Sequence, residues 1–310
     1  MVKKIKIFKN FEVNKTLKNS LILVGNFDGL HAGHQKLFKQ AQKYKKKFKL
    51  KVGVVTFDPI PKMFFNKKIK NYRISNFNQK VNYLNKFGVD FLINKTFNKK
   101  FSKIKCQEFV KKIISKKLKA KYIFVSNNFR FGFKREGDVK LLKNYQSICN
   151  YKLINPRPLK RNKKIISSSY IRKLLQNGNL NKANKFLTRN WTVEGMVEKG
   201  RMMGKKIGFP TCNIDIGNYV IAKPGVYAVK ILVNKNKKIY KGIANLGYRP
   251  TFKQKKILLE VNLFNFSGNL YNKKLSVEFL KFIRGEKKFK GIDELRSQIK
   301  IDLLKAKKIK

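Results

Sequence analysis

The stretch LILVGNFDGLHAGHQKLF, residues 21–38, joins a short apolar run, a glycine-containing turn and the start of a helical pattern. The apolar run predicts a strand over 21–25 that is buried on both faces, and HQKLFKQAQKYKKKF predicts a helix over 34–48. A strand that leads through a glycine turn into a helix is typical of the carboxyl edge of an open α/β sheet, where phosphates bind. The stretch therefore predicts both the fold of its domain and the place of an anion site.

The alternation of strand and helix continues along residues 1–187. Further apolar runs predict strands over 52–57, 90–94, 122–126 and 151–155. The segments between them predict helices over 78–87, 107–118 and 138–149. This order predicts a parallel sheet with crossover helices, a Rossmann-like layer.

The pattern of the sequence changes after about Trp191, from alternating strands and helices to strands alone. Runs rich in β-branched and aromatic residues predict strands over 191–198, 225–233, 238–247, 257–266 and 274–283. Such spacing without intervening helices is typical of a small antiparallel barrel or sandwich. A closing helix is predicted within 291–308, with Ile292, Leu295, Ile299 and Leu303 at helical spacing. We therefore expect two domains, 1–187 and 188–310.

Both histidines of the 310-residue chain, His31 and His34, lie in the turn of the opening stretch. Near the start of a helix, both imidazoles can donate hydrogen bonds to an α-phosphate whose charge grows during in-line attack. Glycines 25, 29 and 33 let the backbone approach an anion closely. The alternatives are two ordinary surface histidines or part of a metal site, but two ligands alone make a poor metal site. The pattern favours nucleotide chemistry.

The segment GNFDGLHAGH resembles the G-x-F-D-G-x-H-x-G-H signature of bacterial bifunctional riboflavin kinase and FAD synthetase. Three later segments are similar to further elements of that family in the same order: TFDPIP at 56–61, NFRFG at 128–132 and ISSSYIR at 166–172. The resemblance implies that His31 and His34 catalyse adenylyl transfer and that Asp58 binds flavin. It also implies a set of residues that bind ATP and its phosphates: Gly25, Phe27, Asp28, Gly33, Asn128, Arg130, Ser168, Ser169 and Arg172.

The segment GRMMGKKIGFPTCNI at 200–214 resembles the riboflavin kinase motif of the same family. The resemblance implies that Thr211 and Asn213 ligate Mg²⁺ bound to ATP, and oxygen ligands suit that hard cation. It implies a phosphate-covering flap with Gly204, Lys205 and Pro210, a catalytic base at Glu260 and a flavin contact at Arg284. The implied reactions are phosphorylation of riboflavin to FMN and adenylylation of FMN to FAD, both with ATP and Mg²⁺.

Four positions depart from the family pattern. Ile60 stands for a histidine, Ser169 for a threonine, Lys205 for an arginine and Asn265 for an aspartate. Ser169 keeps its hydroxyl, but Ile60 removes a polar contact and Lys205 loses the two-pronged guanidinium. We expect both activities to persist, with adenylylation slowed or altered in nucleotide preference. A monofunctional cytidylyltransferase-like enzyme is an alternative, but it leaves GFPTCN and the β-rich second half unexplained.

The formal net charge of +59 suggests a polyanionic partner, which makes a nucleic-acid-binding protein the other alternative. Of the 75 basic residues, however, 11 are arginine, and the lysines are spread along the whole chain beside abundant Asn, Ile and Phe. That distribution is typical of an AT-rich coding sequence, and no nucleic-acid recognition motif is present. We expect small-molecule partners and no specific nucleic acid; the oligomeric state is left open.

The three cysteines, Cys106, Cys149 and Cys212, lie far apart without a C-x-x-C pair. They predict neither a disulfide framework nor a zinc site. No run of about 18 apolar residues could span a bilayer, and the first residues lack the apolar segment of a signal peptide. We therefore expect a cytoplasmic enzyme with no membrane partner.

Overall fold

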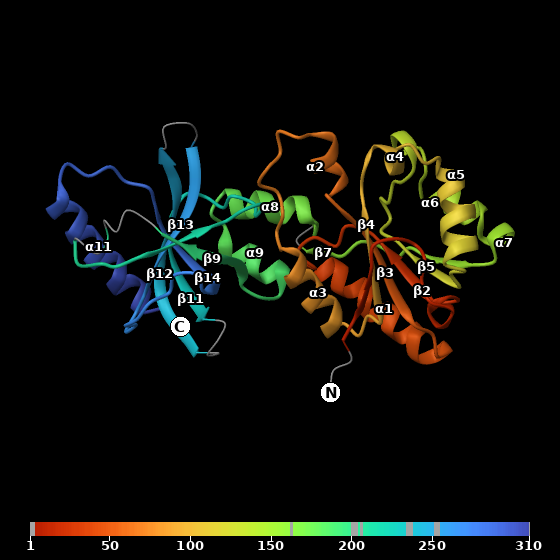
Figure 1. The fold of residues 1–310 in the computed structure, drawn as a ribbon, viewed down its shortest axis with the longest axis horizontal. Helices are drawn as coiled ribbons and strands as arrows, with labels where there is room; N and C mark the ends of the chain where they lie inside the picture. The colour runs from red at the N-terminus through yellow and green to blue at the C-terminus, as the bar shows by residue number, and fades with distance from the viewer. Residues whose placement is uncertain are drawn as a thin grey trace. The chain divides into compact units, whose positions relative to one another are not determined.

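The computed structural model describes residues 4–161, 164–199, 204, 207–233, 238–250 and 255–309. The chain forms two compact units (Figure 1). The first unit contains residues up to 70 and 77–167, and the second contains 71–76 and residues from 168 onward. No helix among the described residues is both long and apolar enough to cross a membrane.

The first unit is built on a six-stranded parallel sheet with the order β1-β4-β3-β2-β5-β6. The five predicted strands are confirmed, and β1 is a sixth that the prediction missed because it is a three-residue edge strand in a lysine-rich stretch. The strands are β1 (Lys6–Phe8), β2 (Leu21–Val24), β3 (Val52–Asp58), β4 (Phe91–Thr96), β5 (Tyr122–Phe124) and β6 (Lys152–Ile154).

Helices cover both faces of this sheet, because successive strand residues point to opposite sides. Leu21 and Leu23 pack on one side with α1 and α3, whereas Ile22 and Val24 pack on the other with η2 and α6. The predicted helix over 107–118 is π-helical across Phe109–Lys117, and the one predicted over 138–149 breaks at Tyr145. The helices are η1 (Lys15–Leu17), α1 (Ala32–Phe48), α2 (Pro61–Phe65), α3 (Phe77–Lys86), α4 (Lys99–Ser102), α5 (Cys106–Glu108), η2 (Phe109–Lys117), η3 (Phe133–Arg135), α6 (Val139–Asn144) and α7 (Gln146–Cys149). A small hairpin of β7 (Lys160–Arg161) and β8 (Lys164–Ile165) follows β6.

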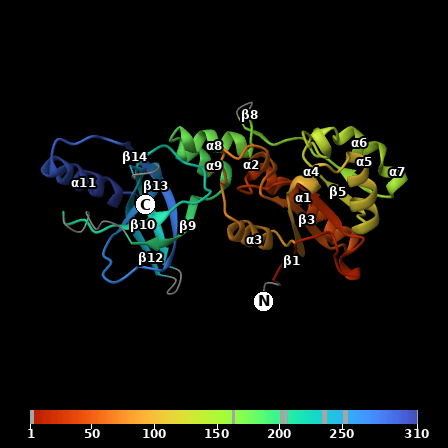
Figure 2. The same cartoon turned by 45° about the horizontal axis from the view of Figure 1, so that its top comes forward.

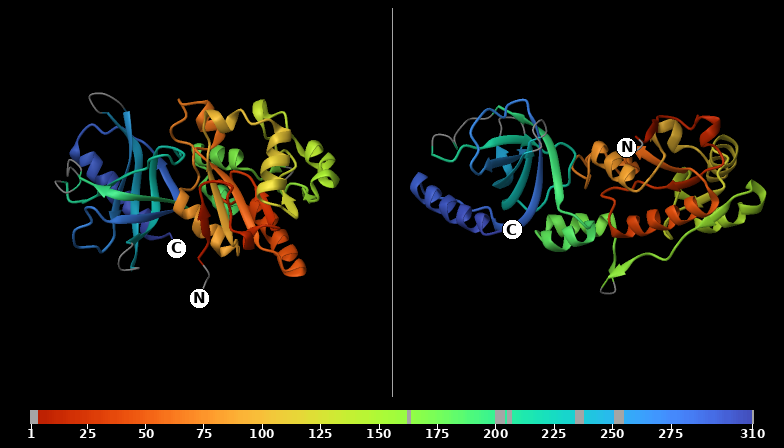
Figure 3. Two further views of the ribbon diagram at one scale, coloured as in Figure 1. Left: turned by 45° about the vertical axis from the view of Figure 1, so that its right-hand side comes forward. Right: turned by 90° about the horizontal axis from the view of Figure 1, so that it is seen from below.

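The second unit is a closed antiparallel barrel with the order β10-β13-β12-β11-β14-β9, which decides between the predicted barrel and sandwich. The prediction missed β10, which lies inside the GFPTCNI motif. Trp191 packs its ring 4.6 Å from that of Phe279 inside the barrel. The strands are β9 (Trp191–Glu198), β10 (Cys212–Asp215), β11 (Gly225–Val233), β12 (Lys238–Pro250), β13 (Lys255–Leu263) and β14 (Lys274–Gly285). The predicted closing helix is α11 (Ile292–Lys307), which packs against β11, β12 and β14 (Figure 3).

Two helices before the barrel also belong to the second unit. These are α8 (Ser168–Gln176) and α9 (Leu180–Leu187); α9 packs against β9 and β14, and α8 packs against α9 (Figure 2). Asn184 donates to the carbonyl of Phe279 at 2.9 Å and accepts from the backbone N–H of Trp191 at 2.8 Å. The contacts therefore divide the chain after residue 167, whereas the sequence places the boundary at 187.

A short stretch from the first half of the sequence, residues 71–76, completes the second unit. The backbone N–H groups of Tyr72 and Arg73 donate to the carbonyl of Asn218 at 2.9 and 2.8 Å. The Trp191 indole donates to the carbonyl of Ile74 at 3.0 Å, and the Ile74 side chain is buried. The barrel unit is thus discontinuous in sequence.

Candidate active sites

The two histidines lie together at the start of α1 in the first unit. His31 is the N-cap residue, and its Nδ1 accepts from the backbone N–H of His34 at 3.4 Å. The two imidazoles stack with their centroids 3.7 Å apart, and the Phe27 ring meets His34 edge-on at 5.3 Å. The helix therefore begins two residues before the predicted start and carries both side chains at its N-terminus, the end that attracts anions.

The turn that holds the histidines is tightly packed. A Cβ at Gly33 would lie 3.1 Å from His31 ring atoms and 3.2 Å from the Ile166 carbonyl. Phe27 and Leu30 adopt φ values of 45° and 34°, in the left-handed region that non-glycine residues rarely occupy. Asp28 is almost fully buried in the same turn. The sequence predicted this turn correctly, but gave no sign of its strained backbone.

The other predicted residues of the first unit are more exposed. Arg130 pairs with Asp138 at 3.4 Å on the surface, and Asn128 is exposed nearby. Asp58 ends β3 and is half-buried. Ile60, which replaces the family histidine, is 3% exposed and so takes a core position just before α2.

The ISSSYIR residues Ser168, Ser169 and Arg172 belong to the second unit, on the first turns of α8. Arg172 is 7% exposed, and its guanidinium carbon lies 3.6 Å from the centre of the Tyr72 ring. Its Nε donates to the Tyr72 carbonyl at 2.7 Å. The sequence did not predict Tyr72 as a partner, because nothing local connects residues 100 positions apart.

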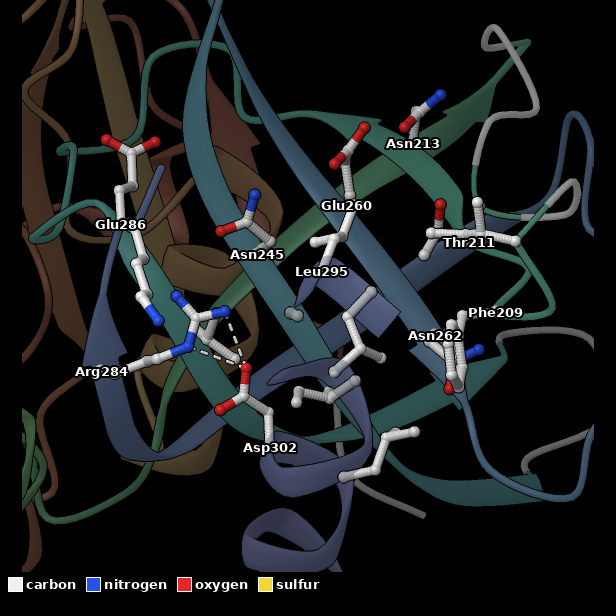
Figure 4. Close-up of a pocket in the computed structure, with 18 of the residues that line it drawn as sticks. Phe209, Thr211, Asn213, Asn245, Glu260, Asn262, Arg284, Glu286, Leu295 and Asp302 are labelled. Carbon is white, nitrogen blue, oxygen red and sulfur yellow. Dashed lines mark hydrogen bonds and ion pairs between the residues drawn. The ribbon is translucent and has the colours of Figure 1, made fainter. Parts of the chain in front are cut away.

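A cavity of about 360 Å³ opens in the second unit, and five of the predicted kinase residues line it: Gly204, Thr211, Asn213, Glu260 and Arg284 (Figure 4). Asn213 on β10 is directly opposite Glu260 on β13, and Glu260 is directly opposite Asn245 on β12. Residues that face each other across antiparallel strands place their side chains on one side of the sheet, so these three line the same wall. Asn245 was not predicted, because its place beside Glu260 depends on the register between β12 and β13.

The wall near Asn213 has the features of a cation site. The Asn213 side chain is 7% exposed, and its buried Oδ1 has no hydrogen-bond partner among the described residues. Thr211 also lines the cavity. Burial raises the pKa of the Cys212 thiol, between them in sequence, to about 12, so that thiol stays neutral. The oxygen atoms of Thr211, Asn213 and Glu260 are of the type that Mg²⁺ prefers.

Two of the three predicted flap residues, Gly204 and Pro210, lie among the described residues. Gly204 lines the cavity, and a Cβ there would lie 2.4 Å from the Phe209 carbonyl, so a larger residue would collide. The carbonyl of Pro210 accepts a hydrogen bond from the Asn262 side chain at 2.7 Å. Lys205 lies outside the described residues. Asn265, another departure from the family, has a φ of 52°, a conformation that asparagine tolerates well.

The helix α11 contributes an apolar part of the cavity wall. Leu295, Ile299 and Leu303 line it with apolar surface. Arg284 donates from both Nε and Nη2 to one Asp302 oxygen, at 2.8 Å each. The sequence predicted Arg284 but missed Asp302, which is 1% exposed and belongs to the helix that closes the wall.

Comparisons with known proteins match the two halves of the chain to two different family models. A family model described as FAD synthetase matches residues 13–170, and one described as riboflavin kinase matches 187–310. Relatives named bifunctional riboflavin kinase/FMN adenylyltransferase include those of Buchnera aphidicola subsp. Schizaphis graminum (38% identical, 96% of each chain) and Haemophilus influenzae (34%, 95% of each chain). That of Escherichia coli K12 is 34% identical over 93% of this chain and 91% of its own.

A solved structure from Streptococcus pneumoniae has the same fold over nearly the whole chain. It superimposes with a TM-score of 0.87 at 30% identity and covers 99% of this chain and 100% of its own. It carries the name of a macrolide-efflux protein, but both halves of the present chain match enzyme families. The chain therefore belongs to the bifunctional riboflavin kinase/FMN adenylyltransferase family.

Proposed function

We propose that the two activities of this bifunctional transferase are carried by the two halves, with riboflavin phosphorylated in the barrel cavity and FMN adenylylated at the histidine turn. In the first reaction the ATP γ-phosphoryl group passes to riboflavin, which gives FMN and ADP. In the second the FMN phosphate attacks the α-phosphorus of another ATP, which gives FAD and pyrophosphate. The arrangement of Asn213, Glu260 and Asn245 on one cavity wall is the observation that carries this assignment.

In the kinase reaction, Glu260 is the group suited to accept the proton of the riboflavin 5′-hydroxyl as that oxygen attacks the γ-phosphorus. Glu260 lies on β13, which pairs with β10 and β12 in the closed barrel, so its carboxylate is held on the cavity wall. Thr211 and Asn213 would hold Mg²⁺ beside it, and the unpartnered Oδ1 of Asn213 supports that role. Mg²⁺ bound there would neutralise charge on the ATP phosphates.

The apolar end of the kinase cavity fits the flavin ring. Leu295, Ile299 and Leu303 offer apolar surface, and a cavity of about 360 Å³ is in the range that small-molecule ligands occupy. Arg284, held by Asp302, stands at the edge of this wall (Figure 4). Its remaining N–H groups are suited to the polar edge of the ring.

In the adenylylation reaction, His31 and His34 are suited to donate hydrogen bonds to the α-phosphate oxygens as FMN attacks. The positive end of the α1 dipole acts in the same direction. Ser168, Ser169 and Arg172 would bind the β- and γ-phosphates, as the family motif implies. The stacking of Arg172 on Tyr72 would hold the guanidinium in one orientation.

The assignment is tested with two reciprocal variants of the full chain. Glu260→Gln is expected to stop FMN formation from riboflavin and MgATP, while FAD still forms from supplied FMN. His31→Ala is expected to stop FAD formation from supplied FMN, while FMN still forms from riboflavin and MgATP. Products are separated by chromatography with fluorescence detection, and riboflavin binding is measured by quenching. A Glu260→Gln chain that still phosphorylates riboflavin at the wild-type rate would remove Glu260 from the role of base.

We also propose that the enzyme works in the cytoplasm. All three cysteines are unpaired thiols, which is typical of a reducing compartment. Cell fractionation with a tagged chain tests this proposal; enrichment in the membrane fraction would contradict it.

A further inference from the structure

The first unit contains a buried lysine that no sequence motif singles out. Lys80 lies on α3 and is 1% exposed, although lysine is rarely buried to that extent. Its ammonium donates to the carbonyl of Asn26 at 2.9 Å and to the hydroxyl of Thr56 at 3.2 Å. Thr56, itself fully buried, donates to the same Asn26 carbonyl at 3.2 Å.

These bonds end at the histidine turn. Asn26 is the residue between Gly25, whose N–H bonds to the Val55 carbonyl at 3.0 Å, and Phe27, the first residue of the turn with a left-handed backbone. The Phe27 ring in turn contacts His34. A chain of direct contacts therefore runs from Lys80 through Asn26 and Phe27 to a histidine of the candidate active site.

The surroundings of Lys80 form a small polar layer at the carboxyl edge of the sheet. Asn94 on β4 is the register partner of Thr56 and is 4% exposed. Val54 and Leu92, two residues earlier on each strand, belong to the apolar core below. Lysine thus carries its charge into the boundary between the core and the turn, where a charge is costly unless it is hydrogen-bonded.

We propose that Lys80 is a positioning residue for adenylyl transfer. Its ammonium fixes the Asn26 carbonyl, and so holds the strained backbone of Phe27 and the imidazole that Phe27 contacts. Its buried charge also adds positive potential beneath a turn that receives a triphosphate. This inference rests on the proposed assignment of the turn as the adenylylation site.

A purely structural lysine would behave differently. Methionine has a similar length and no charge, so it removes the hydrogen-bond donor together with the cost of burying an ammonium group. Thr56 would still bond to Asn26 in a Lys80→Met chain. A positioning role therefore predicts loss of rate without loss of stability, whereas a structural role predicts that stability falls.

The test compares Lys80→Met with Lys86→Met, a matched change of an exposed lysine on the same helix. In the full chain with FMN and MgATP, Lys80→Met is expected to lower kcat for FAD formation about 10- to 100-fold, the effect of one lost charged hydrogen bond. The KM values for FMN and ATP should stay within about threefold, and neither the melting temperature nor the rate of riboflavin phosphorylation should fall. Lys86→Met should match the wild type in every respect.

A folded Lys80→Met chain with the wild-type kcat would overturn the proposal. If Lys80→Met lowers the melting temperature, Thr56→Val decides: it keeps the side-chain shape and removes one Lys80 partner. A severalfold lower kcat at unchanged melting temperature supports the proposal, and an unchanged kcat overturns it. His31→Ala is measured in parallel, because normal FAD formation by that variant would show that the assignment of the turn itself is wrong.

Discussion

The ion pair between Arg284 and Asp302 offers a direct test of the kinase cavity. Both guanidinium bonds reach one carboxylate oxygen at 2.8 Å, and Gln298 donates to the other at 3.1 Å. The Asp302 side chain is 2% exposed, whereas that of Arg284 is 21% exposed. Asp302 thus ties α11, and with it the apolar wall of the cavity, to β14.

Asp302→Asn keeps the shape of the side chain and removes its charge. Breaking a buried pair costs about 3–5 kcal/mol when one charge is left without a partner. Arg284 can regain some water because it is partly exposed, so we expect a loss of about 2 kcal/mol in the free energy of unfolding. That corresponds to a fall of about 4–8 °C in the melting temperature of this unit. A looser α11 should also raise the KM for riboflavin about tenfold, with the KM for ATP little changed.

The assay is steady-state FMN formation together with thermal unfolding followed by calorimetry. Asp293→Asn is the matched control, because Asp293 lies on the same helix, is 98% exposed and approaches Arg296 no closer than 3.9 Å. Exposed pairs of this kind contribute little, so this variant should match the wild type. An Asp302→Asn chain with unchanged riboflavin KM would refute the idea that this pair shapes the flavin end of the cavity.

Four further outcomes are expected. Replacing His31 or His34 by alanine should lower FAD formation about 10²- to 10³-fold and leave FMN formation intact, since each would stabilise charge in adenylyl transfer alone; a parallel loss of both products would contradict this. Removal of Mg²⁺ by EDTA should stop both reactions, and Asn213→Ala should raise the Mg²⁺ concentration needed for FMN formation without changing that for FAD; equal shifts would refute the ligand role. Duplex DNA should bind with a Kd on the order of 10⁻⁴ to 10⁻⁶ M at physiological salt and without sequence preference; nanomolar selective binding in a gel shift would overturn the compositional reading of the charge. A fragment of residues 168–310 should make FMN and no FAD, and it should melt below the full chain because it lacks 71–76, which complete this unit. A fragment of 187–310 should melt at a still lower temperature because it also lacks α8 and α9; equal melting temperatures of the two fragments would show that these helices do not stabilise the barrel.

The fold was largely predictable because its strands are buried. Parallel strands covered on both faces appear as continuous apolar runs, and the turn after β2 has a distinctive order of glycines and histidines. Two strands were not predicted, and each has a local cause. The strand β1 is a three-residue edge strand among lysines, and β10 lies within the GFPTCNI motif, whose residues were interpreted as ligands and not as a strand. The π-helical stretch Phe109–Lys117 has the same apolar spacing as an α-helix over so short a range.

The candidate sites were predictable where chemistry lies in one segment, and not where it depends on contacts between distant segments. Thr211, Asn213 and Glu260 were predicted from motifs and do line one cavity. Asn245 joins them through strand register, and Asp302 joins through the packing of α11. Tyr72 reaches Arg172 because residues 71–76 leave the first unit and pack into the second. No periodic pattern in the sequence indicates that residues 71–76 pack into the second unit.

The lysine-rich composition gives no indication of which lysines occupy special positions in the fold. A chain with 75 basic residues, 11 of them arginine, offers no sequence signal that would separate one lysine from another. Composition drives lysine into positions where water solvates the ammonium, and there a change from one polar residue to another has little effect on stability. Among the residues that the structure describes, Lys80 is the one lysine that is buried. A drift toward lysine does not by itself explain that position, because burying an ammonium group is costly and here requires its hydrogen bonds to Asn26 and Thr56. Burial is therefore the observation that separates Lys80 from the exposed lysines around it and makes it the lysine to test.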